Sequence, residues 1–242
     1  MRMHTATGRS RWPYVIVGAV AVVAIVGGVA FAATRPADEP VAAPTTSAPA
    51  SATPTAAPTA GSSGAGDNED DVPPTGCLGS PDRNADMVLT AQGTAKHTSF
   101  GAVEVATAFN RWLWQFPYPS TGDSETVSDE IMASGAPEGY KDLAGAYEAA
   151  GDDLTQGTVP AGTPFHVSTT NGLWLVSEES TADRVVVLVA AGYVVDGALS
   201  STLTMVGGYA MVWEGDAWRI ESSVVPDQDL LAAGGNRYTG GC

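Results

Sequence analysis

The residues of this chain with the widest chemical range are its histidines, His4, His97 and His166, and its two cysteines. Zinc sites use such residues at short fixed spacings, because neighbouring ligands must point at one ion. No histidine here has a partner at H-x-x-x-H spacing, and the cysteines do not form a C-x-x-C pair. The sequence therefore predicts neither a metal site nor a bound cofactor.

Acids and hydroxyl groups that could support catalysis are present, but not in catalytic patterns. The chain contains neither a G-x-S-x-G nucleophile elbow nor a G-x-x-x-x-G-K-[ST] phosphate loop. The acid pairs Asp152-Asp153 and Glu178-Glu179 are adjacent in sequence, so in a strand or loop their side chains point apart and stay hydrated. The sequence therefore predicts a protein that is not an enzyme.

The charges of the chain are unevenly distributed. It has 27 Asp and Glu against 11 Lys and Arg, which gives a formal net charge of −16. Arg2, Arg9 and Arg11 precede every acidic residue, the first of which is Asp38. An acidic surface repels phosphate backbones, so we expect no direct binding to nucleic acid.

Residues 13–33 are predicted to form a single transmembrane helix. The run from Tyr14 to Ala33 has no charged side chain, and it is long enough to cross a bilayer core of roughly 30 Å. Arg9 and Arg11 precede it, so the positive-inside rule makes residues 1–12 a cytoplasmic basic tail. The remainder of the chain is then extracellular, and the lipid bilayer is its first partner.

A cleaved signal peptide is the alternative for this segment. Ala30-Phe31-Ala32 has the A-x-A pattern of a cleavage site. The apolar run exceeds the usual signal-peptide core of about 7 to 15 residues, which favours the uncleaved anchor. Both alternatives export the same domain.

Residues 34–76 are rich in Pro, Ala, Thr, Ser and Gly, and are predicted to be a disordered linker before an extracytoplasmic domain at 77–242. The two cysteines, Cys77 and Cys242, stand at the two ends of that domain. In an oxidising compartment they are expected to form a disulfide. Unpaired or intermolecular thiols are the alternative.

The first half of the exported domain has the periodicity of helices. Apolar residues recur at three- and four-residue steps between Thr98 and Phe116, with Thr98 or Ser99 as cap and Pro117 as stop. Shorter helices are predicted at 124–133 and after Pro137.

The second half has β-branched and aromatic runs that predict strands. The separators Asn171-Gly172, Asp196-Gly197 and Glu214-Gly215-Asp216 have the residue types of tight hairpins. Gly207-Gly208 is predicted to bend a long strand. The five predicted strands are 165–170, 173–178, 184–195, 199–213 and 217–225.

Helices followed by a long meander predict an α+β domain, with helices packed on one face of a curved antiparallel sheet. This order, with the closing hairpin Val212 to Ile220, resembles the cone-shaped domains of the nuclear transport factor two-like superfamily. Among membrane-tethered members it is similar to assembly proteins of type IV secretion and conjugation systems. Three segments and the helix from Ala102 to Pro117 are also similar to a family of anchored proteins of high-GC Gram-positive bacteria. The segments are Gly76-Cys77-Leu78-Gly79, Ala182-Asp183-Arg184-Val185 and Thr239-Gly240-Gly241-Cys242.

The resemblance implies a structural or assembly component of a conjugation or secretion system. Its expected partners are other envelope or secretion-apparatus proteins, and homo-oligomers are among the expected assemblies. Two alternatives stay open. An extracytoplasmic ligand-binding or sensory domain would use the interior of the cone as a pocket. An enzyme would need a buried carboxylate with a tyrosine, a residue type that Tyr193 and Tyr209 could supply.

One aromatic patch is a candidate for protein contact. Trp112 and Trp114 are two residues apart and cannot share a helix face. If Trp112 is buried, Trp114 is expected to face outward beside Phe116 and Tyr118, and aromatic side chains often anchor interfaces. Packing of Trp114 under the Pro117 to Pro119 loop is the alternative.

Overall fold

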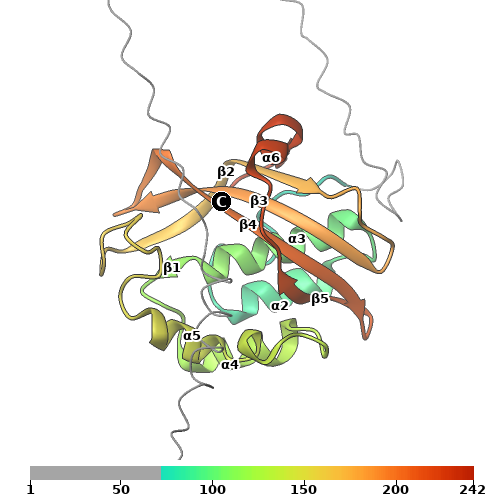
Figure 1. Ribbon diagram of the computed structural model, residues 1–242, viewed down its shortest axis with the longest axis horizontal. Helices are drawn as coiled ribbons and strands as arrows, with labels where there is room; N and C mark the ends of the chain where they lie inside the picture. Colours follow the sequence, from blue (N-terminus) through green and yellow to red (C-terminus); the bar gives the residue numbers. More distant parts are fainter. Residues whose placement is uncertain (1–71) are drawn as a thin grey trace, which may run out of the picture.

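The computed structural model describes residues 72–242, drawn in colour in Figure 1. The predicted cytoplasmic tail, the membrane helix at 13–33 and the linker up to residue 71 lie outside the described residues. Pro74 and Gly76 are buried, so packing begins within the end of the predicted linker. Within residues 72–242, no helix has the length and hydrophobicity that a membrane crossing requires.

The helices begin where a polar side chain can accept a hydrogen bond from a free backbone amide. The predicted cap Thr98 accepts from Gly101 N, and Asn84, Ser120, Asp142 and Asp227 act in the same way for other helices. The helices are α2 (Ala85–Thr94), α3 (Ser99–Leu113), α4 (Thr121–Ile131), α5 (Leu143–Ala150) and α6 (Gln228–Gly234), with a 3-10 turn at Glu138–Tyr140.

All strand pairs of the sheet are antiparallel, in the order β1-β2-β3-β4-β5, with β6 beside β2. Asp196-Gly197 and Gly215-Asp216 occupy the β3–β4 and β4–β5 turns with positive φ, which confirms those two hairpins. The strands are β1 (Gln115–Phe116), β2 (Phe165–Val176), β3 (Arg184–Val195), β4 (Ala198–Glu214), β5 (Ala217–Ser223) and β6 (Asn236–Arg237).

The hairpin predicted at Asn171-Gly172 is wrong. Both predicted strands around it belong to β2, and both pair with β3 across a register shift between Ser168 and Leu173. Asn171 has φ of 59°, and a Cβ on Gly172 would lie 2.7 Å from the Ala190 carbonyl oxygen. The two residues therefore form a bulge that bends one long strand.

The described domain confirms the predicted α+β class, with helices against a curled, cone-like antiparallel sheet. In Figure 1 the sheet lies above α2 and α3, α4 and α5 lie below them, and α6 lies on the opposite side of the sheet. Leu231 of α6 packs there against Leu188 and Ala190, as a small second cluster.

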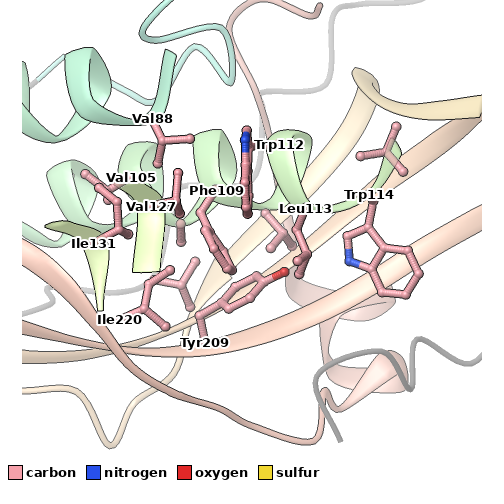
Figure 2. Close-up of a cluster of buried hydrophobic side chains, with 14 of the residues drawn as sticks. Val88, Val105, Phe109, Trp112, Leu113, Trp114, Val127, Ile131, Tyr209 and Ile220 are labelled. Carbon is pink, nitrogen blue, oxygen red and sulfur yellow. The ribbon is translucent and has the colours of Figure 1, made fainter. Parts of the chain in front are cut away.

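The space between α3 and the concave side of the sheet is filled by side chains (Figure 2). Phe109 is 2% exposed and meets Tyr209 edge to face, with ring centroids 5.6 Å apart. Trp112 and Trp218 are fully buried. Close packing of large rings from α3 and the sheet thus holds the two layers together.

We expect Phe109→Ala to lower the free energy of unfolding by about 3–5 kcal/mol, because it removes a ring from the middle of a packed core. Equilibrium urea denaturation measures this loss. Val225→Ala is the control, since that side chain is 95% exposed and its truncation should change stability little. Equal effects of the two substitutions would contradict the position assigned to Phe109.

Candidate functional site

The ends of the described domain are joined by a disulfide between Cys77 and Cys242, as predicted. The S–S distance is 2.06 Å and the Cα atoms are 5.6 Å apart, at a sequence separation of 165. Thr169 of β2 anchors both ends, because its amide donates to the Cys242 carbonyl oxygen (3.0 Å) and its hydroxyl donates to the Gly76 carbonyl oxygen (3.2 Å). We call residues 74–80 and 236–242 together the clasp.

The clasp covers a polar face of α3. Glu104, Thr107 and Arg111 are spaced so that they lie on one side of the helix. The Thr75 amide donates to Glu104 Oε1 (2.5 Å), the Thr107 hydroxyl is 2.8 Å from the Tyr238 hydroxyl, and Arg111 Nη2 donates to the Ser80 carbonyl oxygen (3.4 Å). Burial raises the pKa of Glu104, while hydrogen bonds from Thr75 and Gly76 oppose that rise.

A group of basic side chains lies at the Arg111 end of this face. It consists of Arg83, Arg111 and His166, and we call it the cationic cluster. Arg111 is fully buried, and its Nε and Nη1 have no hydrogen-bond partner. Burial, with the nearby charge of Arg83, lowers the pKa of Arg111 to about 10, so it remains protonated at neutral pH. Burial and the two arginines lower the pKa of His166 to about 4, which makes His166 neutral.

The predicted contact residues are partly brought together. Trp114 is only 2% exposed, so its ring is not on the surface. Phe116 and Tyr118 are half-buried and meet edge to face, with ring centroids 5.1 Å apart. Tyr118 also stacks on Tyr147 and lines a surface groove of about 590 Å³. Two carboxylates, Asp142 and Glu148, line the same groove, so it has an acidic and aromatic wall.

A histidine–carboxylate pair lies at the closing hairpin. The ring of His97 stacks on Trp213 with centroids 4.2 Å apart, and its Nε2 is 2.9 Å from Asp183 Oδ1. Both members of the pair are exposed. Within residues 72–242, no cluster of three His, Cys, Asp or Glu side chains is placed to hold a metal ion.

The tyrosines considered for an enzyme lie in the packed core. Tyr193 is 1% exposed, and the buried hydroxyl of Tyr209 donates to Asn110 Oδ1 (2.5 Å). Burial raises the pKa of both hydroxyls well above the usual value, so both are neutral phenols at physiological pH. The hydrogen bond of Tyr209 joins the sheet to α3, and the ring of Tyr193 packs beside Phe165 within the sheet.

Sequence reasoning did not find the cationic cluster. A charged stripe on an amphipathic helix ordinarily faces solvent, and nothing local in the sequence indicates that the clasp covers this one. The available signal was the cysteine pair, because joining residues 77 and 242 must bring both ends to one place.

Comparisons of the chain with protein-family models, with curated proteins and with solved structures gave no match.

Loss of the disulfide is expected to destabilise the domain by about 2–5 kcal/mol, since it releases a large loop in the unfolded chain. The double variant Cys77→Ser/Cys242→Ser, compared with wild type by thermal denaturation, measures this. Wild-type protein treated with reductant serves as the control and should match the variant. Mass analysis that finds two free thiols in the unreduced protein would contradict the pairing.

His166 makes stability depend on pH in a specific window. Because its pKa is about 4 in the folded protein and about 6.5 in an unfolded chain, the unfolded state binds the proton first as pH falls. The contribution of His166 to the free energy of unfolding is therefore complete above pH 6.5 and is lost on acidification toward pH 4. His166→Gln should therefore have a flatter profile of melting temperature between those values, measured by circular dichroism.

The control for this profile is His97→Gln, which alters the other histidine of residues 72–242. If His166→Gln and wild type lose stability in parallel over the window, the lowered pKa of His166 is wrong.

Proposed function

We propose that this chain is a non-enzymatic, membrane-tethered envelope protein that works through contacts of its outer surface. One observation supports this most strongly: the interior of the cone is filled. A ligand pocket needs room between the helices and the sheet, and that room is occupied by buried rings, among them Phe109 of α3 and Tyr209 of the sheet, which meet edge to face.

The finer proposal is a structural or assembly component of a conjugation or secretion system. Its supports are the resemblance of the helices-then-meander order and the expected topology, in which residues 13–33 anchor the chain and 34–76 extend the domain from the membrane. The alternative of a sensory domain with a pocket inside the cone has less support, because a ligand there would have to displace core side chains.

The surface around Tyr118 is our candidate for the contact. Phe116 and Tyr118 offer aromatic area beside an acidic groove, and interfaces concentrate their binding energy in such aromatic residues. A partner with basic side chains would complement Asp142 and Glu148 electrostatically. Trp114 is only 2% exposed and does not contribute to this surface.

Photocrosslinking in the native membrane tests the proposal. A photoreactive amino acid at Tyr118 is expected to give adducts with another envelope or secretion-apparatus protein, identified by mass spectrometry. The control position is Leu230 on α6, which is 49% exposed but lies on the opposite side of the sheet. Adducts from Leu230 alone would make the chosen surface wrong, and adducts with no envelope protein from either position would count against the assembly function.

A further inference from the structure

The cationic cluster has buried guanidinium nitrogens that form no hydrogen bond within residues 72–242. Arg111 is fully buried, and two of its three guanidinium nitrogens, Nε and Nη1, have no partner; the same holds for Nε of Arg83. An unpaired buried charge is strongly unfavourable, and buried polar atoms in native proteins almost always have a partner. These guanidinium nitrogens therefore need a further hydrogen-bond acceptor, which a bound anion could supply.

No acidic side chain of residues 72–242 fills this role. The ion pairs found within these residues involve other basic side chains: His97, Lys141 and Arg184. Glu104 is two helical turns from Arg111; its Oε1 accepts the Thr75 amide, and its Oε2 is buried without a hydrogen-bond partner. Its charge acts on Arg111 only at a distance.

Three elements contribute the residues of the cluster. Arg83 lies just before α2, Arg111 lies in the last turn of α3, and His166 pairs across the β1–β2 ladder with Gln115. Gln115 also donates to the Arg83 carbonyl oxygen (2.9 Å), which ties β1 to the segment before α2. Arg83 and His166 are half-buried, so solvent reaches the cluster on their side.

We propose that Arg83, Arg111 and His166 form a binding site for a small free oxyanion of the phosphate class. Two guanidinium groups match the charge and the planar, two-oxygen recognition of a phosphate dianion. The anion enters between Arg83 and His166, the flexible Arg83 side chain moves aside, and the free nitrogens of Arg111 donate to it. A neutral His166 donates through one ring nitrogen, and binding of the anion favours its protonation.

Thermal unfolding of the full-length chain in detergent tests the site. Sodium phosphate is added at constant ionic strength, with chloride as the balancing salt and acetate and sulfate in parallel series. We expect a saturable rise in melting temperature with phosphate, and a smaller one with acetate, because a monoanion neutralises one arginine only. A larger effect of acetate than of phosphate would overturn the assignment to the phosphate class.

Arg111→Met is the decisive variant. Without phosphate it should be at least as stable as wild type, because it replaces an unpaired buried charge by an apolar side chain of similar length. It should bind phosphate roughly tenfold or more weakly, since charge-assisted hydrogen bonds are lost. Arg184→Met, which changes a surface arginine paired with Glu221, is the matched control and should keep the phosphate response.

A second readout does not depend on folding stability. In proton NMR titrations phosphate should raise the pKa of His166, and Arg83→Gln should weaken the effect. The proposal is overturned if wild type shows no saturable response to phosphate, if Arg111→Met responds like wild type, or if His166 titrates identically with and without phosphate.

Discussion

Near-complete burial of α3 is the constraint on which the rest of the domain depends. Of its 15 residues, 13 are buried, although the helix carries polar side chains on one side. Buried polar groups need partners, and each partner comes from a different part of the chain. Asn110 receives the Tyr209 hydroxyl from the sheet, Thr107 meets Tyr238, and Glu104 receives the Thr75 amide. The apolar side of α3 thus requires the sheet, and its polar side requires the clasp.

This division explains why the concave side of the sheet has little free space, so that contacts with other molecules are expected at the outer surface. Bulky rings project from α3 toward the sheet and leave the concave side full (Figure 2). What remains for recognition is on the outside: the aromatic and acidic groove near Tyr118, and the half-buried side chains of Arg83 and His166. These two places differ in charge, so they suit partners of different chemistry.

The sequence allowed the fold class to be predicted, because helix and strand periodicities are local properties. Local signals failed where a distant segment decides the outcome. Asn171-Gly172 has the residues of a hairpin, but the register of β3 makes it a bulge within β2. The sequence analysis predicts no helix at α2, because its four buried residues, Ala85, Met87, Val88 and Ala91, include two small alanines and give only a weak apolar pattern. The disulfide was predictable, whereas the polar side of α3 beneath the clasp was not, because amphipathicity does not show what will cover a face.

The disulfide also determines how the domain responds to tension. Where residues 13–33 hold the chain in a membrane, a pull on the domain enters at its first packed residues, Pro74 to Cys77. Without the covalent link, such a pull would peel residues 74–80 away from α3 one hydrogen bond at a time. The bond to Cys242 instead divides the force between two segments that are both fastened to Thr169, at the bulge of β2. The hydrogen bonds there would have to break together, so the disulfide reinforces the fold at the N-terminal end of the described domain.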